Sequence, residues 1–167
     1  MGCTICTVKV KLIYECVGVA FGICAGGFYS IVFHMISASI VAFISSIFAA
    51  LGVYMHVASL KKWMITWTES RFKTMFWINL LVFILSTAGM VGCCVYAGVL
   101  HQGLTVDDLQ DKENYWMTAC WCLITAKWSG MNAYYSRGYA AQIKAMLLAQ
   151  FTPAMEQFPH SEYIEKV

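Results

Sequence analysis

Four long apolar runs dominate this 167-residue chain, and they constrain its fold more than any other feature. They cover about residues 12–32, 40–60, 75–100 and 115–135. Each run is close to the ~20 residues that a helix needs to cross the hydrocarbon core of a bilayer. Hydrophobic residues make up 60% of the sequence and charged residues only 12%, whereas soluble domains are usually about 45–50% apolar. The sequence therefore predicts an all-α integral membrane protein, with a four-helix bundle over residues 12–135.

The segments outside the runs complete the predicted organisation. Residues 1–11 form a short N-terminal tail. After the fourth run, apolar residues at helical spacing predict a helical extension over residues 136–152, in the cytosol or along the membrane surface. Pro153 is expected to end this helix and to leave a flexible tail over residues 153–167.

The distribution of charge predicts how the bundle is oriented. Basic residues precede the first run, fill the loop after the second and follow the fourth, whereas the loop after the third run is mostly acidic. Because short loops rich in Lys and Arg stay in the cytosol, the N- and C-termini are both predicted to be cytosolic. The acidic loop then faces the exterior or an organelle lumen. The basic residues are Lys9, Lys11, Lys61, Lys62, Arg71, Lys73, Arg137 and Lys144, and the acidic ones are Asp107, Asp108, Asp111 and Glu113.

Gly18, Gly22 and Gly26 form a repeated GxxxG pattern in the first run. Glycines at this spacing lie on one helix face and let a second helix approach closely. The sequence leaves three alternatives open for this face: packing against another helix of the chain, contact with a second copy in a homo-oligomer, or a groove for a flat ligand.

His56 lies inside the second run, where a titratable side chain is costly and usually faces a pathway, a ligand or a partner helix. Ser45, Ala49 and Gly52 precede it at intervals of four, three and four residues, so small side chains share its helix face. One interpretation is a close-packed face with a hydrogen-bonded histidine. The other is a slot for a planar macrocycle, with His56 as an axial ligand of its iron.

Lys127 is the deepest charge in the fourth run, and Tyr134 shares its helix face. An ammonium at this depth needs an anion, a carbonyl, water or the loss of its proton. Glu15 is the carboxylate within the runs, but its depth matches Arg137 better than Lys127. We therefore expect Lys127 to face a central cavity and to attract an anionic substrate.

The remaining polar features narrow the function class. His34 and His101 lie at the outer ends of runs, where each is either an ordinary solvated residue or a group that catches a metal-bearing ligand from outside. The sequence contains no HExxH, Walker or GxSxG motif, so it does not predict an enzyme. Its basic residues are too dispersed for a nucleic-acid surface, which leaves the lipid bilayer as the predicted macromolecular environment.

Several stretches of the chain resemble the heme-responsive-gene family of animal, nematode-like four-span heme transporters. The resemblance covers about residues 12–145 and is most specific around His56 and Lys127. The matching residues are His56 with Leu60, Lys61, Lys62, Trp63, Thr66 and Trp67; His101 with Gln102, Leu104 and Thr105; and Tyr115, Cys120, Trp121, Lys127, Trp128, Tyr135 and Tyr139.

This resemblance implies a transporter that moves heme from the outside, or from an organelle lumen, into the cytosol. In the family, an outer-loop histidine, a histidine or tyrosine in the second span and a cytosolic aromatic-basic motif are implicated in heme passage. Those roles fall on His101, on His56, and on Tyr135, Arg137 and Tyr139. His56 and His101 would then be the ligands of the heme iron.

The resemblance agrees with the chemistry of heme, a flat apolar ring with a central iron and two carboxylates on one edge. Imidazole or phenolate groups suit the iron, and cations suit the carboxylates. His101 and His34 at the outer side, and His56 deeper in the bundle, supply imidazoles for the iron. Lys127 and Arg137 supply cations for the carboxylates, and Tyr134 supplies a hydroxyl donor. A transported ligand is expected to pass between weak sites and not to stay in a tight cage.

Two other function classes remain open at this point. One is a non-transporting tetraspan subunit for assembly or trafficking, and the other is a membrane heme enzyme or electron carrier, which would retain heme tightly on purification. The plasma membrane is the favoured location and an endo-lysosomal membrane the alternative. The reason is that Leu147 and Leu148 lack the acidic residue of a dileucine signal, and Tyr163 lacks the bulky apolar residue of a tyrosine sorting signal.

Overall fold

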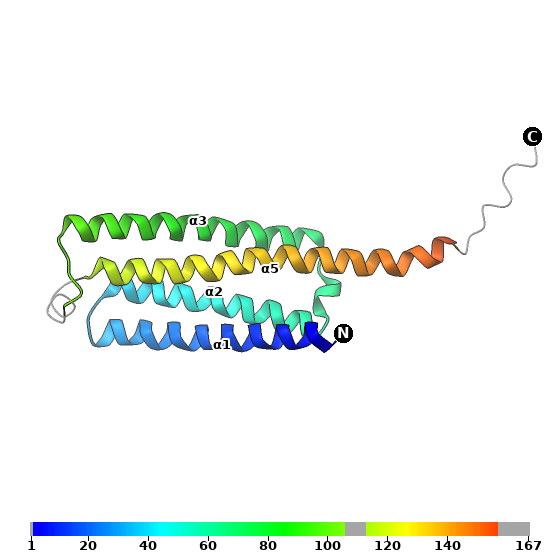
Figure 1. Ribbon diagram of the computed structural model, residues 1–167, viewed down its shortest axis with the longest axis horizontal. Coiled ribbons are helices and arrows are strands. Elements are labelled where there is room, and N and C mark those ends of the chain that lie inside the picture. Colours follow the sequence, from blue (N-terminus) through cyan, green and yellow to red (C-terminus); the bar gives the residue numbers. More distant parts are fainter. Residues whose placement is uncertain (1, 106–112, 157–167) are drawn as a thin grey trace, which may run out of the picture.

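The structure is a computed structural model that describes residues 2–105 and 113–156, with side chains described for residues 8–105 and 113–149. Over these ranges it consists of helices α1 (Gly2–Ile31), α2 (Ile36–Leu60), α3 (Glu69–Val99) and α5 (Tyr115–Glu156), with a short 3-10 helix, η1 (Trp63–Thr66), between α2 and α3. The four α-helices lie side by side in an elongated bundle, and α5 projects beyond it (Figure 1). The predicted all-α class is confirmed.

Three of the helices are long and apolar enough to cross a membrane: the part of α1 from Val8 onward, α2 and α3. The fourth predicted run lies in α5, which is more polar, but Thr125, Ser129 and Asn132 in that run are buried. Polar side chains that face other helices are tolerated in a membrane helix. α5 runs alongside the other three helices (Figure 1), and a fourth crossing by its N-terminal part stays a prediction.

The helices are longer than the runs that predicted them. α1 begins at Gly2 and α3 at Glu69, because a helix can continue past the hydrocarbon core into water. α5 continues to Glu156, so the expectation that Pro153 ends it is wrong. Proline removes one backbone donor but has a helical φ, and the last turn of a helix can lose one hydrogen bond. The rest of the predicted flexible tail, 157–167, lies outside the described residues, as do residues 106–112 of the acidic loop.

The helices pack in the order α1, α2, α5, α3. The short connection between Ile31 and Ile36 makes α1 and α2 an antiparallel hairpin. The buried face of α2 consists mainly of small side chains, which let α1 and α5 approach it closely. The small buried residues of α2 are Ala38, Ser39, Ala42, Ser45, Ser46, Ala49, Gly52 and Ala58.

The glycine face of α1 packs inside the chain. A Cβ atom on Gly22 would lie 2.8 Å from the Cβ of Ser46 and 3.1 Å from the carbonyl oxygen of Ala42, both on α2. Such distances leave no space for a side chain without a shift of the helices. The glycines on either side, Gly18 and Gly26, meet Trp128 and Phe43. Packing within the chain is therefore the alternative that the structure supports, and a homo-oligomer, which stays a prediction, would need another surface.

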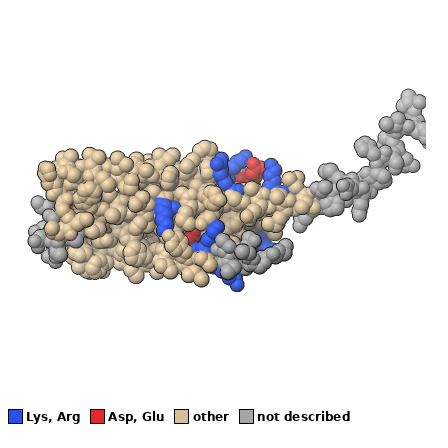
Figure 2. All heavy atoms as spheres, viewed as in Figure 1, with Lys and Arg blue, Asp and Glu red and all other residues tan. Residues whose placement is uncertain are grey.

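The two ends of the bundle differ in charge. Basic side chains gather where the chain begins and where α5 leaves the bundle, which we call the basic end (Figure 2). The opposite end, called the loop end, carries the connection from α1 to α2 and the segment after α3 (Figure 1). The N-terminus and the extension of α5 both lie at the basic end, in agreement with the prediction that the two termini share one side of the membrane.

Candidate functional site

His56 lies about one turn before the basic-end terminus of α2, and its side chain is fully buried. The α-helical pitch places Ser45, Ala49 and Gly52 on the same face, and all three are buried as well. The face therefore points into the bundle, as the sequence predicted for His56. The strip of small residues is filled by neighbouring helices and does not form an open slot.

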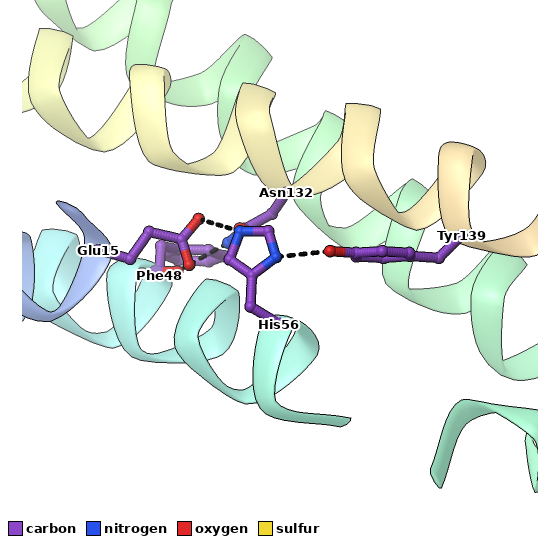
Figure 3. Close-up of polar contacts among 5 residues, drawn as sticks. All are labelled: Glu15, Phe48, His56, Asn132 and Tyr139. Atoms are coloured by element: carbon purple, nitrogen blue, oxygen red, sulfur yellow. Dashed lines mark hydrogen bonds and ion pairs between the residues drawn. The ribbon is translucent and has the colours of Figure 1, made fainter. Parts of the chain in front are cut away.

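Two tyrosines of α5 contact the imidazole, and Figure 3 shows one of them, Tyr139. The hydroxyl of Tyr139 lies 2.6 Å from His56 Nδ1, within hydrogen-bond distance. The ring of Tyr135 lies beside the imidazole, with the two centroids 4.8 Å apart. The sequence named both tyrosines as site residues, and the structure brings both to His56.

Glu15 of α1 approaches the imidazole from the other side (Figure 3). Its Oε1 atom lies 3.2 Å from His56 Nε2, and both side chains are fully buried. The contact is an ion-pair distance without hydrogen-bond geometry, since neither carboxylate oxygen has a hydrogen-bond partner among the described residues. The sequence placed Glu15 at a depth nearer to Arg137 than to Lys127, but Arg137 turns to α3, where its guanidinium carbon lies 4.4 Å from the Phe76 ring centroid.

Gly52 makes room for this carboxylate. A Cβ atom on Gly52 would lie 2.5 Å from Glu15 Oε2 and 2.6 Å from Oε1, closer than any real contact. The glycine therefore has a specific role, which is to let the carboxylate sit against α2 beside His56. The sequence placed Gly52 on the correct face but did not indicate what would fill the space.

Both ring nitrogens of His56 are occupied in this arrangement. An imidazole binds iron through a ring nitrogen whose lone pair is free. Tyr139 takes the Nδ1 side and Glu15 the Nε2 side. The structure is therefore a closed form of the site, and an iron-bearing ligand can reach His56 only after one of these neighbours moves.

A second buried polar contact lies nearby on α5. Asn132 Nδ2 donates to the carbonyl oxygen of Phe48 at 2.7 Å (Figure 3). The Oδ1 atom of Asn132 is buried without a hydrogen-bond partner among the described residues. This amide was not among the predicted site residues, and the only sequence signal for it was a polar residue seven positions before Tyr139.

The two predicted outer histidines both lie at the loop end, and both are exposed. His34 follows α1 and His101 follows α3, and each has a left-handed backbone with φ of 52°. This conformation ends a helix and is usually taken by Gly or Asn. The structure places the pair at the same end of the bundle, remote from His56, as the sequence predicted.

The loop end is held together by a polar network that the sequence did not reveal. The Glu113 carboxylate accepts hydrogen bonds from the backbone N–H groups of Ile36 at 2.6 Å and Ser37 at 3.1 Å, at the start of α2. A carboxylate at a helix N-terminus is favourable. Asn114 caps α5 by accepting from the N–H of Trp116 at 3.0 Å. These contacts link the residues before and at the start of α5 to the start of α2 at the loop end.

Lys127 does not face a cavity, so that expectation is wrong. Its side chain is exposed on the surface of α5, where the ammonium contacts the hydroxyl of Tyr14. Its Nζ atom also lies 4.5 Å from the ring centroids of both Tyr14 and Trp128, at cation–π distance. Trp128 fills the space beside Gly18, and this turns Lys127 outward at the junction of α1 and α5.

Tyr134 and Arg137 also lie at the surface of α5, with Arg137 on the side of α3. Tyr134 is 74% exposed, and Arg137 is exposed as well. The predicted site residues thus divide into two groups. His56, Tyr135 and Tyr139 form the inner group, and Lys127, Tyr134 and Arg137 form an outer group on the surface of α5.

The described residues contain no group of three or more His, Cys, Asp and Glu side chains that could hold a metal ion. A lone histidine between aromatic rings suits a ligand that brings its own iron better than it suits a bare ion. A membrane bundle with such a histidine is compatible with the class of membrane proteins that bind or carry an iron-containing ligand.

Comparison with known proteins identifies the family within this class. The family described as haem-transporter, endosomal/lysosomal, haem-responsive gene matches residues 72–128. Heme transporter hrg-4 of Caenorhabditis elegans is 31% identical, over 83% of this chain and 84% of the relative. Heme transporter hrg-1 of the same organism is 35% identical, over 81% and 69%, and hrg-6 is 31% identical, over 80% and 83%. No solved structure matches the chain.

The chain belongs to the haem-responsive-gene family of haem transporters. The resemblance noted in the sequence is therefore confirmed. Since transport is not an enzymatic function, the expectation that the chain is not an enzyme agrees with this family.

Proposed function

We propose that this protein carries heme across a membrane from the loop end to the basic end of the bundle. The family supports heme as the transported substrate. The observation that carries the proposal is His56, an imidazole buried between three helices and flanked by two tyrosines near the basic end. A titratable side chain at that depth usually faces a pathway, a ligand or a partner helix, and the family makes heme the ligand that we propose for it.

The distribution of charge supports the direction. The basic end collects most of the Lys and Arg side chains (Figure 2), and segments with this bias stay in the cytosol. The loop end, with His34 and His101, would then face the exterior or an organelle lumen. Heme is captured at the loop end, binds His56 on its way and leaves near Tyr135 and Tyr139.

The individual sites need to be weak for transport to proceed. A carrier has to bind its substrate well enough to accept it and loosely enough to release it. We propose that His101 and His34 capture the heme iron outside, that His56 with Tyr139 holds it next, and that the basic side chains attract the propionates. The occupied ring nitrogens of His56 fit this scheme, because they compete with the iron.

Heme-dependent growth tests the proposed function. The chain is expressed in a host that cannot make heme, and growth is followed at limiting external heme. We expect the parent to support growth at heme concentrations where the host alone fails. If growth with the protein at the cell surface equals that of the host alone, the chain does not transport heme in this orientation.

The loop-end histidines predict a capture step on the outer side. His101 is exposed, and an imidazole nitrogen with a free lone pair can bind the heme iron. We expect His101→Ala to lower heme uptake about threefold at limiting external heme and matched surface levels, because one outer iron ligand is lost. Equal uptake by the two proteins would remove His101 from the capture step.

Lys127 is the second candidate for a contact with heme, now at the surface of α5. Its ammonium rests on Tyr14 and Trp128 and has no carboxylate within ion-pair distance among the described residues. We propose that it meets a propionate at the junction of α1 and α5. Lys127→Met should weaken heme binding about fivefold, as the loss of a charge-assisted contact would.

Esterified heme provides the control for Lys127. Removing the propionate charges should weaken binding to the parent and leave binding to Lys127→Met nearly unchanged, as measured by absorbance titration of the purified proteins. Equal losses for both proteins would show that Lys127 does not contact the propionates.

We propose the plasma membrane as the location, because the C-terminal sequence lacks a recognisable sorting signal. The proposed direction does not depend on this choice, since an endosomal lumen is equivalent to the cell exterior. Fluorescence microscopy of the tagged protein in animal cells, with surface and endosomal markers, decides between them. Exclusive overlap with the endosomal marker would contradict the proposal.

A further inference from the structure

Glu15 is a buried carboxylate to which the proposed transport steps assign no role. It is fully buried between α1 and α2, and both its oxygens lack a hydrogen-bond partner among the described residues. A buried charge without such partners is costly and calls for an explanation. Among the described residues its ion-pair contact is with His56, whose Nε2 lies 3.2 Å from Glu15 Oε1.

The carboxylate occupies the place where iron would approach Nε2. A ligand atom of iron lies about 2 Å from the metal, so Glu15 and a heme iron cannot both sit beside the same nitrogen. The other nitrogen, Nδ1, is held more firmly, because Tyr139 makes a 2.6 Å contact with it and is packed in the core with Met55 and Phe72. Glu15 is therefore the neighbour more easily displaced.

The surroundings of Glu15 fit a movable contact. The carboxylate sits over Gly52, which has no side chain of its own to hold it in place. Its helix, α1, packs along α2 and not along α3 (Figure 1). A small separation of α1 from α2 at Gly52 would take the carboxylate away from Nε2 and leave the contact with Tyr139 in place.

We propose that Glu15 is a positioning residue that closes the iron-binding side of His56, and that heme binding displaces it. This inference rests on the proposed role of His56 as a heme ligand. Glu15 then weakens heme binding, because its carboxylate competes with the heme iron for the space beside His56 Nε2. The carboxylate returns to Nε2 when heme leaves. The competition keeps His56 a transient site, as conduction requires.

Chemical modification of His56 tests the closing contact without heme. Diethylpyrocarbonate reacts with free imidazole nitrogens, and mass spectrometry follows each histidine of the purified protein separately. His56 should react slowly in the parent and at least about fivefold faster in Glu15→Ala, because local opening then exposes Nε2. Glu15→Gln keeps the size of the side chain and should retain most of the protection. His34 and His101 are exposed and should react equally in all variants.

Gly52→Ala gives an independent route to the same state. Its Cβ would lie 2.5 Å from Glu15 Oε2 and should push the carboxylate away, so His56 again becomes reactive. Gly27→Ala is the matched control, since its Cβ meets nothing within 4 Å. Unchanged reactivity of His56 in both Glu15→Ala and Gly52→Ala would overturn the proposal. If one variant does not fold, the other decides.

A heme titration then tests the competition. We expect Glu15→Ala to bind heme about tenfold more tightly than the parent, which corresponds to ~1.4 kcal/mol, and to release it more slowly. In the background of His56→Ala, the Glu15→Ala change should have no such effect. Weaker or equal binding by folded Glu15→Ala would overturn the competition. If the parent and His56→Ala bind heme equally, the ligand role of His56 fails, whereas the modification experiment still decides whether Glu15 covers Nε2.

Discussion

His56→Ala is expected to lower heme uptake at least about tenfold, or ~1.4 kcal/mol in apparent binding, at a matched amount of protein in the membrane. The substitution removes the only imidazole that the described structure places between the helices. The tyrosines alone then offer the iron a phenol, which binds less well while it keeps its proton. Uptake of heme into cells that cannot make it measures the effect.

The variant needs a control for its effect on folding. Without His56, Glu15 is left as a buried carboxylate with no charged neighbour, and breaking a buried pair in this way costs about 3–5 kcal/mol. The double variant Glu15→Ala/His56→Ala removes this unpaired carboxylate as well, and with it the cost in stability. We expect it to reach the membrane and still to transport poorly. If the double variant regained the parent's uptake, the loss in His56→Ala would come from the orphaned charge and not from a missing iron ligand.

Gly22→Val is expected to lower the stability of the bundle. Already a single Cβ atom at this position would lie 2.8 Å from Ser46 Cβ and 3.1 Å from the Ala42 carbonyl oxygen. Overpacking of this kind costs about 1–3 kcal/mol, and for a chain of this size each kcal/mol lowers the Tm by roughly 2–4 °C. α1 and α2 would be forced apart, and the Glu15 contact with His56 would be lost with them.

The matched control for this prediction is on the same helix. Gly27→Val changes the same residue type five positions away, where a Cβ meets nothing within 4 Å. Thermal unfolding in detergent should give a Tm near that of the parent for Gly27→Val and a clearly lower one for Gly22→Val. Equal Tm values for the two variants would contradict the packing of α1 against α2.

The helices could be predicted from the sequence because a membrane imposes a length and a composition on them. Each of the four apolar runs lies on one of the α-helices. The short connection before Ile36 makes the first two helices an antiparallel hairpin. The length of an apolar run, however, is set by the thickness of the hydrocarbon core, and the helix itself can extend beyond the run at either end. This is why the start of α1 and the extension of α5 beyond Pro153 were missed.

The orientation of His56 could also be predicted, because small residues at helical spacing marked its face of α2 as buried. The partners of His56 could not. Depth along a helix placed Glu15 beside Arg137, but the rotation of α1 turned the carboxylate to His56 and the packing of Trp128 turned Lys127 outward. These rotations depend on which side chains fill the spaces at Gly18 and Gly52, and such spaces exist only once helices are packed.

Transport into sealed vesicles is the most direct test of the central claim. Purified protein is reconstituted into liposomes that contain a heme-free peroxidase, and orientation is measured by protease access to the C-terminal tail. With the loop end outside, we predict that added heme activates the enclosed enzyme with the parent, and that His56→Ala with the same orientation and content gives at least about tenfold less activation. Activation by the parent no faster than by protein-free vesicles, or equal activation by His56→Ala, would contradict the claim that heme crosses this bundle by way of His56.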